Sequence, residues 1–396
     1  MNNISIIDRK KCYSCRSCEY SCPQKCISFS EDIEGFFYPE VDEKKCINCG
    51  CCLLKCPSYD AYTLAKYEKK YYGLKSKDIE LLKNSASGGI FAEIAKYTLA
   101  RQGYVFGAAY DESFRVKQTL CDNFDSLKRL QGSKYVYCDT GTSYEQIKKL
   151  VETTKEVLFG GSPCQVAGLK KYLGKDYPNL ITIDIICHGT PSQKLFLKYL
   201  EWLEKKHNGR ILEYSFRDKR IGGWSCQGKA KTDSKEIIID GRIDPYYSSF
   251  LSGKTYKYAC YQCQYSNIQA RPGDITIGDF WAVSYYQPEF YSQNGVSSCI
   301  INTEKGEHIF ELIKNNFDVC EIDEKQVSAK NGNIIHPTKE PATRMKIYEG
   351  IDTLSLNQYM QKLQLPKVLL IRNYLKKLIP KSFVNYLKTI IGGTNI

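Results

Sequence analysis

Runs of apolar residues in this chain are followed by helical patterns of apolar and polar residues, in units that repeat. Residues 157–159 predict a buried strand, which is followed by a Gly-rich loop and a helix ending at Leu173. Residues 180–186 predict a second buried strand, and after a second loop a helix covers 193–206. Successive strand–loop–helix units favour a parallel sheet with right-handed crossovers.

Other segments of the chain extend this pattern. Residues 90–100 place apolar side chains at helical spacing and stop before Gly103, which predicts an amphipathic helix. The remaining predicted elements are strands at 4–7, 35–39, 104–109, 211–218 and 274–281, a turn leading into a strand at 131–136, and a helix at 143–152. The expected fold class is α/β, or α+β over the whole chain.

The cysteines near the N-terminus form one pattern that occurs twice. The first copy ends in Pro23 and the second in Pro57, with the sequence Cys-x2-Cys-x2-Cys-x3-Cys-Pro in both. Three thiols on a tight loop cover one face of a [4Fe-4S] cluster, and the fourth reaches the other cluster. The spacing therefore predicts a small bacterial-type ferredoxin domain with two clusters. The predicted ligand sets are Cys12, Cys15, Cys18 and Cys56 for one cluster, and Cys46, Cys49, Cys52 and Cys22 for the other.

Zinc and disulfides are the other common uses of clustered cysteines. Zinc sites usually take four ligands as two separated pairs, which fits these evenly spaced quartets poorly. The chain has 19 cysteines, but its first residues do not begin a signal sequence, and thiolate clusters need a reducing compartment. The cysteines therefore favour a cytoplasmic location. Cys26 and Cys51 exceed the two ligand sets and are expected to be small buried residues.

Length and composition indicate more than one domain. A chain of 396 residues with 42% hydrophobic content exceeds one ordinary domain and can bury a sizeable core. No apolar run reaches the roughly 18 residues of a spanning helix, so we expect a soluble protein. We expect a ferredoxin-type domain at 1–66, a mixed α/β domain at 71–352 and a basic amphipathic helical tail at 353–396.

The formal net charge of +12 raises the question of an anionic partner. Lysines are scattered, and no zinc-finger, RNP-type or helix-turn-helix signature is present, which argues against nucleic acid. Near the C-terminus, however, basic residues occur without acidic ones among them: Lys362, Lys367, Arg372, Lys376, Lys377, Lys381 and Lys388. This tail could lie on anionic lipid, pack on the protein or contact a partner enzyme, and Pro366 and Pro380 keep each helical piece short.

Cysteines also follow both buried strands of the repeated units. Cys164 lies in the first loop and Cys187 begins the second, at the sheet edge where open α/β sheets bind ligands. Cys260 and Cys263 add a Cys-x2-Cys pair. These four thiols predict a third [4Fe-4S] cluster, with a four-cysteine zinc site or four unrelated cysteines as alternatives. The other cysteines are expected to be structural: Cys121, Cys138, Cys226, Cys299 and Cys320.

A Ser/Gly loop at 84–89 leads directly into the helix predicted at 90–100. Such a loop presents backbone N–H groups and the positive end of the helix dipole, which suits a phosphate group. It is equally compatible with an ordinary serine cap followed by two glycines. The spacing leaves both interpretations open.

Short motifs follow one another in a fixed order from about residue 71 to 345. They are Ser-Ala-Ser-Gly-Gly (85–89), Gly-Ser-Lys-Tyr (132–135), Gly-Ser-Pro-Cys-Gln (161–165), Cys-His-Gly (187–189), Phe-Arg-Asp-Lys (216–219) with Gly-Trp (223–224), the pair at 260–263, and Gly-Asp-Ile-Thr-Ile-Gly-Asp (273–279). This ordered set resembles the coenzyme F420 hydrogenase/dehydrogenase beta-subunit family of iron–sulfur flavoproteins. With its ferredoxin pattern, the chain is similar to the bacterial form often encoded among polysaccharide-synthesis genes.

The resemblance implies a mixed α/β flavin-binding domain with bound FAD and a [4Fe-4S] cluster near the flavin. It thereby supports Cys164, Cys187, Cys260 and Cys263 as cluster ligands. The flavin contacts that it implies are Ser85, Ser87, Gly88, Gly89, Gly132, Ser133 and Lys134. One departure is Cys138, where the family pattern is expected to have a small polar residue.

These features together predict an oxidoreductase. Low-potential [4Fe-4S] clusters would take single electrons from a soluble donor such as ferredoxin, and the flavin would deliver them in pairs to an organic acceptor. The acceptor could be coenzyme F420 or a small molecule of a polysaccharide pathway. The alternative is a non-catalytic electron-transfer subunit that feeds a partner enzyme. His188, Lys134 and Asp279 are candidates for proton delivery, without a catalytic assignment.

Overall fold

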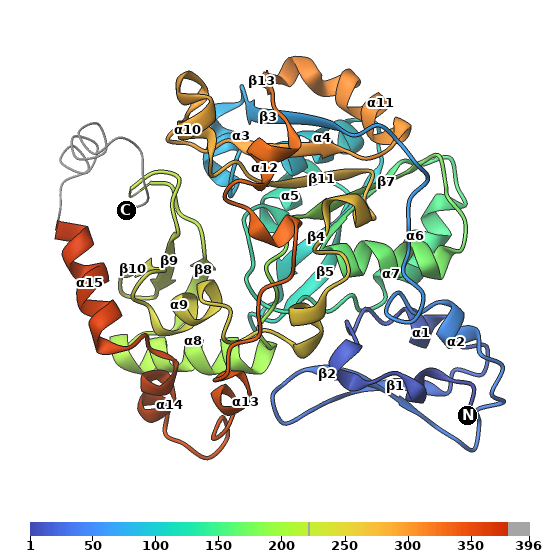
Figure 1. The fold of residues 1–396 in the computed structure, drawn as a ribbon, viewed down its shortest axis with the longest axis horizontal. Coiled ribbons are helices and arrows are strands. Elements are labelled where there is room, and N and C mark those ends of the chain that lie inside the picture. Colours follow the sequence, from blue (N-terminus) through green and yellow to red (C-terminus); the bar gives the residue numbers. More distant parts are fainter. Residues whose placement is uncertain (221, 379–396) are drawn as a thin grey trace.

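The computed structural model describes residues 1–220 and 222–378. Within them, the centre of the molecule is a mixed sheet with the strand order β13-β3-β12-β11-β7-β6-β4-β5 (Figure 1). The strands are β3 (Lys70–Ser76), β4 (Tyr104–Tyr110), β5 (Val116–Cys121), β6 (Val157–Gly161), β7 (Leu180–Ile185), β11 (Ile275–Asp279), β12 (Ser297–Ile301) and β13 (Phe317–Glu321). Strands β4, β6, β7 and β11 are parallel neighbours, and the outer strands pair antiparallel. The predicted α/β class is confirmed, and antiparallel strands extend the parallel centre at both edges.

Helices cover both faces of the central sheet (Figure 1). They are α4 (Ile90–Ala100), α5 (Phe124–Leu130) and α11 (Glu304–Ile313) on one face, and α6 (Ser143–Val151) and α7 (Pro163–Leu173) on the other. In β6, Leu158 packs with Ile94 of α4, while the next residue, Phe159, packs with Val166 of α7. Successive side chains of a strand point to opposite faces, so a strand buried on both sides needs an unbroken apolar run.

A second, antiparallel sheet carries an aromatic core. Its strands are β8 (Ile211–Ser215), β9 (Gln227–Thr232) and β10 (Glu236–Asp240), and α8 (Gln193–His207), α9 (Pro245–Leu251) and α14 (Leu356–Leu363) pack with it. The ring of Phe196 in α8 lies 5.3–5.5 Å from those of Tyr214, Phe216 and Tyr246. Short helices in the connections are α3 (Ile79–Asn84), α10 (Val283–Tyr286), α12 (Glu324–Ser328) and α13 (Arg344–Ile347).

The first part of the predicted basic tail packs on the protein. Helix α14 buries Tyr359, Met360 and Leu363 in the aromatic core, and α15 (Lys367–Leu378) follows it at the side of the molecule (Figure 1). The predicted features at Pro380, Lys381 and Lys388 lie outside the described residues. In the part of the chain that is described, we find no helix with both the length and the apolar character needed to cross a membrane.

A small N-terminal domain lies next to α6 and α7 (Figure 1). Its elements are α1 (Ser17–Tyr20), β1 (Ile27–Glu31), β2 (Phe37–Val41) and α2 (Cys51–Leu54). Ion pairs join it to the rest of the chain, among them Asp60 with Lys171 and two that involve arginines. Arg16 Nε lies 2.6 Å from Asp139 Oδ1, and Arg344 makes a bidentate pair with Glu34 at 3.0 and 2.6 Å. Since Arg344 is fully buried, the second pair fixes the N-terminal domain against α13.

Two predicted strands are wrong. Ile4–Ile6 forms a 3-10 helix instead, because the Asn3 side chain accepts a hydrogen bond from the Ser5 N–H at 2.9 Å and caps the turn. Residues 131–136 contain no strand, because the unpredicted strand β5 takes the edge position beside β4. After that segment the Tyr137 N–H donates to the Pro191 carbonyl at 2.8 Å, and Asp139 makes one isolated bridge to Lys117 of β5.

Candidate functional site

Four cysteines of the N-terminal domain line one cavity of about 430 Å³. We call them the inner set: Cys12, Cys15, Cys18 and Cys56. They are one of the two ligand sets predicted from the spacing, so the structure brings that set together. Burial raises the pKa of the Cys15 thiol, and the neighbouring Cys56 raises it further. Buried thiols that repel one another as thiolates suit a site where bound iron supplies the positive charge.

The second predicted set lies nearer the protein surface. Its members, the outer set, line a small separate cavity and are Cys22, Cys46, Cys49 and Cys52. Cys49 is exposed, whereas Cys52 is buried. Cys26 and Cys51, which the spacing leaves outside the set, line the same cavity. Cys26 is buried as expected, with its sulfur 3.3 Å from that of Cys22, and Cys51 is only partly buried.

A third group of cysteines lines another cavity, of about 320 Å³, which we call the extended cavity because it runs between many elements of the α/β domain. This third set consists of Cys164, Cys187, Cys260 and Cys263. Cys164 lies in the first turn of α7, and Cys187 lies just beyond the end of β7. Because β6 and β7 are parallel neighbours, with Gly161 opposite Asp184, the two cysteines meet at one sheet edge as predicted. Burial raises the pKa of Cys164, and Cys263, Cys187 and Cys260 raise it further.

The chemistry of these sets fits [4Fe-4S] clusters. Each provides four thiols around a cavity, which is the donor set that a cubane requires. Among the described residues, no three or more His, Cys, Asp or Glu side chains converge on a position for a single metal ion. A cubane is larger than one ion, and its ligands surround a volume. Beside the third set, the fully buried Arg271 pairs with Asp184 and donates to the Tyr265 carbonyl at 2.8 Å.

The extended cavity also reaches the Ser/Gly loop and the start of α4. Six of the seven expected flavin contacts line it: Ser85, Ser87, Gly89, Gly132, Ser133 and Lys134. The serine-cap interpretation is wrong, because Gly89 is the N-cap of α4 and no side chain in the described part of the protein caps that helix. The hydroxyls of Ser85 and Ser87 instead donate to the carbonyls of Leu81 and Val296. The uncapped N–H groups at the start of α4 are therefore free to bind an anion.

Gly88, the seventh expected contact, has a packing role. Its N–H donates to Ser297 Oγ at 2.7 Å, and a Cβ at this position would lie 2.1 Å from the Leu74 carbonyl oxygen. Gly88 is absent from the cavity lining. Only glycine allows the loop to approach β3 this closely.

One residue that lines the extended cavity, Gln118, has a buried oxygen without a hydrogen-bond partner in the described part of the chain. Gln118 of β5 donates from Nε2 to the Gly160 carbonyl at 3.0 Å, which fixes the orientation of its amide. Its buried Oε1 has no hydrogen-bond partner among the described residues. Next to it, Gly160 makes room for the Phe91 ring, since a Cβ there would lie 2.6 Å from that ring. An unpaired acceptor beside an aromatic side chain and an uncapped helix fits a flavin nucleotide, which has an N–H on its ring and phosphates on its tail.

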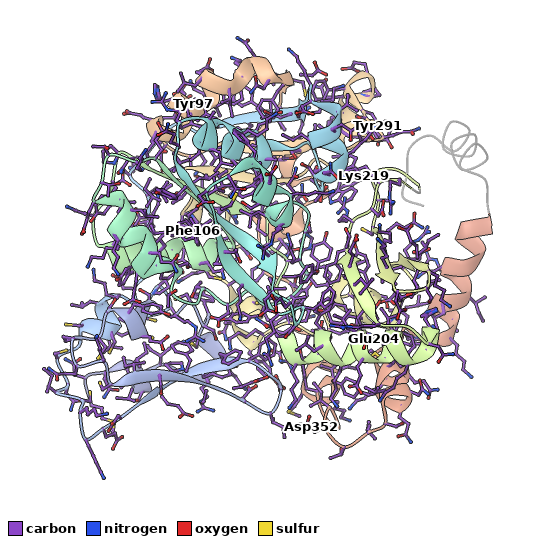
Figure 2. The ribbon with its side chains drawn as sticks, turned by 180° about the vertical axis from the view of Figure 1, so that it is seen from behind. Tyr97, Phe106, Glu204, Lys219, Tyr291 and Asp352 are labelled. Atoms are coloured by element: carbon purple, nitrogen blue, oxygen red, sulfur yellow. The ribbon has the colours of Figure 1, made fainter. Side chains whose placement is uncertain are left out.

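Two cations hold the Ser/Gly loop in place. Arg217 donates to the Ala86 carbonyl at 3.3 Å and pairs with Asp279 at 3.2 Å. Lys219, labelled in Figure 2, donates to the carbonyls of Leu82 at 2.8 Å and Ser87 at 2.7 Å. Burial, followed by the charge of Arg217, lowers the pKa of Lys219 to about 7. Neither cation was expected from the sequence to support the loop.

The proton-delivery candidates have different surroundings. Burial lowers the pKa of His188, and Asp279 opposes that shift. Lys134 donates to the carbonyls of Arg129 and Gln131 at 2.9 and 2.8 Å, and burial lowers its pKa to about 7. Asp279 accepts a hydrogen bond from Trp224 Nε1 at 2.6 Å. All three candidates line the extended cavity, and their roles stay predictions.

The remaining cysteines do not join any of the three sets. Cys121 and Cys299 are buried in the core of the central sheet, and Cys226 and Cys320 are partly buried. Cys138 lines the extended cavity, and burial raises its pKa to about 12. The departure that the sequence placed at Cys138 thus lies at the proposed flavin site.

Tyr13 lines both the inner-set cavity and the extended cavity. Its ring lies 5.9 Å from that of Tyr265, and its hydroxyl accepts a hydrogen bond from the Gln264 N–H at 3.4 Å. The Tyr265 hydroxyl donates to the Pro57 carbonyl at 3.3 Å, next to Cys56 of the inner set. The inner set and the third set are therefore neighbours across one contact between the domains.

Two family models match the chain. The model of the 4Fe-4S dicluster domain matches residues 11–59. The model that describes the C-terminal part of the beta subunit of coenzyme F420 hydrogenase/dehydrogenase matches residues 154–325. The resemblance predicted from the sequence is confirmed. The second match includes Cys164, Cys187, Cys260 and Cys263, and the dicluster domain includes all of the inner and outer sets.

Solved structures also match the chain, and one of them comes from a hydrogenase complex. A chain of the F420-reducing [NiFe] hydrogenase complex from Methanosarcina barkeri, in a xenon derivative, is 16% identical. The match covers 76% of this chain and 91% of that chain, with a TM-score of 0.45. No curated protein matches the sequence.

Proposed function

We propose that this chain is an iron–sulfur flavoprotein oxidoreductase, which takes single electrons from a low-potential donor and delivers them in pairs to an organic acceptor. The observation that carries the proposal is one cavity lined by both the third set and the uncapped start of α4. When bound, the clusters and FAD would supply one-electron storage and its conversion to two-electron chemistry.

Different residues of the chain would bind the cluster and the parts of the flavin. The third set would hold a cluster, the first turn of α4 would bind the flavin phosphates, and Gln118 Oε1 would accept a ring N–H. Arg217 and Lys219 would keep the Ser/Gly loop in position. Because Cys49 is exposed, the outer set is accessible to a soluble donor such as ferredoxin. Tyr13 then connects the inner set to the third set.

Anaerobic purification with iron, sulfide and flavin measured per chain tests this function. About twelve irons and one flavin are expected if all three cysteine sets hold [4Fe-4S] clusters. Cys164→Ser should lose about four irons, whereas Cys320→Ser, outside every set, should keep them all. Zinc in place of iron, or protein that binds no flavin, would refute the proposal.

The acceptor is identified by assay of the loaded protein. Coenzyme F420 and small molecules of polysaccharide pathways are the acceptors to test first, with reduced ferredoxin as donor. Loaded protein that reduces an acceptor only after a partner enzyme is added would indicate an electron-transfer subunit instead.

A further inference from the structure

Lys257 places a buried ammonium group between two of the cysteine sets. The residue is 2% exposed and lies just before the 3-10 helix Tyr258–Gln262, which carries Cys260 of the third set. The Cys260 N–H donates to the Lys257 carbonyl at 2.9 Å. The Lys257 side chain reaches across the domain boundary to the hairpin of β1 and β2. Its Nζ lies 3.3 Å from the centre of the Tyr38 ring and 5.0 Å from that of Phe36.

The protein gives this ammonium group little compensation for the loss of water. Its one hydrogen bond among the described residues goes to the Phe37 carbonyl at 3.4 Å, and no ion pair with a carboxylate is found there. Asp32 and Glu34 act on it at longer range, and Glu34 is already paired with Arg344. Cation–π contacts offset part of the cost of burial, but a buried charge without a paired carboxylate remains unfavourable. Further negative charge near Lys257 would therefore stabilise its ammonium group.

Lys257 lines the extended cavity together with Cys260 of the third set. The Phe37 carbonyl that it contacts also accepts a hydrogen bond from Ser14 Oγ, which lies between Cys12 and Cys15 of the inner set. A [4Fe-4S] cluster with four thiolates carries a net negative charge, and reduction by one electron makes that charge larger. We infer that Lys257 is the positive charge shared by the inner-set and third-set clusters, and that it raises the reduction potentials of both. This inference rests on the proposed function, because it needs a cluster at each of the two sets.

Lys257→Met tests the inference by removing the charge and keeping a similar volume. Lys10→Met is the matched control, since Lys10 is an exposed lysine whose Nζ lies 5.3 Å from the Tyr258 ring at the same domain contact. The measurement is a reductive titration of the anaerobically loaded full chain, followed by EPR, with each signal assigned by a cysteine variant of its set. In Lys257→Met we expect the equilibrium constant for reducing the inner-set and third-set clusters to fall at least tenfold. For one electron this lowers each reduction potential by about 59 mV.

The outer-set cluster should keep its potential in Lys257→Met, and all three clusters should keep theirs in Lys10→Met. Unchanged potentials in Lys257→Met, or an equal shift at all three clusters, would overturn the inference. If Lys257→Met fails to hold iron at the inner and third sets, Lys257→Arg decides. If the arginine variant keeps its iron, a positive charge is needed at this position. If it also loses iron, the shape of the lysine side chain matters instead of its charge, and the inference is overturned. A wild-type chain without iron at the third set would instead refute the proposed function.

Discussion

Gly168 in α7 packs closely against Cys15 of the inner set, across the boundary between the two domains. A Cβ at this position would lie 2.9 Å from both Cβ and Sγ of Cys15. Helix α7 also carries Cys164, so one helix contacts both the inner set and the third set. We predict that Gly168→Ala forces Cys15 or α7 to move by about half an ångström to one ångström, because unstrained contacts begin near 3.5 Å.

The size of the effect follows from two opposing terms. Alanine stabilises a helix relative to glycine by about 1 kcal/mol, whereas forcing an extra carbon into a packed site costs about 1–3 kcal/mol. If an iron–sulfur bond fixes Cys15, the packing cost lies at the upper end of that range, and the protein loses about 2 kcal/mol of stability. Without a bound cluster, Cys15 can move and the two terms nearly cancel.

Iron loss under a chelator challenge, measured together with chemical denaturation, separates these cases. We expect Gly168→Ala to lose about four irons faster than the wild type, from the inner set, and to unfold at lower denaturant concentration. Ala167→Gly on the same helix is the control for helix propensity. Any iron that it loses faster than the wild type should not come preferentially from the inner set. Wild-type iron retention in Gly168→Ala, with higher stability, would refute the reasoning.

Three further predictions concern the domain contact, an internal carboxyl group and the third set. Glu34→Gln should destabilise the docked N-terminal domain by about 3 kcal/mol, because it leaves the buried Arg344 without its carboxylate. Limited proteolysis should then cleave between the domains, and resistance equal to that of the wild type would contradict this. Burial raises the pKa of Asp244 from 3.8 to about 6, so its contribution to stability is present below pH 3.8 and is lost as the pH rises through 6. Asp244→Asn should therefore gain stability relative to the wild type above pH 6, by on the order of 2 kcal/mol, and a difference that does not depend on pH would refute the assignment. Cys263→Ala should lose about four irons while the dicluster domain keeps its own, and loss from all three sets would count against a separate third cluster.

The parts of this fold that the sequence predicts are set by local patterns. The cysteine spacing identifies the inner and outer sets, because ligands on one tight loop have to follow one another at fixed intervals. Helix α4 (Ile90–Ala100) has the predicted bounds, since glycines flank it on both sides. Cys164 and Cys187 meet because neighbouring parallel strands end at the same sheet edge.

What the sequence does not predict depends on contacts between distant segments. Strand β5 (Val116–Cys121) has polar residues on the edge of the sheet and lacks a strong apolar run, so its pairing with β4 gives no local signal. Gln118 and Tyr13 both line the extended cavity, although they come from segments far apart in the sequence. Nothing in the residues around Lys257 predicts its burial, because the aromatic rings that cover it come from the N-terminal domain.

The pairing of buried cations explains why Lys257 differs from the others. Several buried cations have their own carboxylate: Arg271 with Asp184, Arg217 with Asp279, Arg344 with Glu34, and Lys170 with Asp274. Lys134 and Lys219 instead donate to several backbone carbonyls. The protein balances the charges of the four cations that have a carboxylate, whereas burial still lowers the pKa of Lys134 and Lys219 to about 7. Among the described residues, Lys257 has one long hydrogen bond, contacts two aromatic rings and lacks a paired carboxylate, so its charge is available to interact with clusters bound at the inner and third sets.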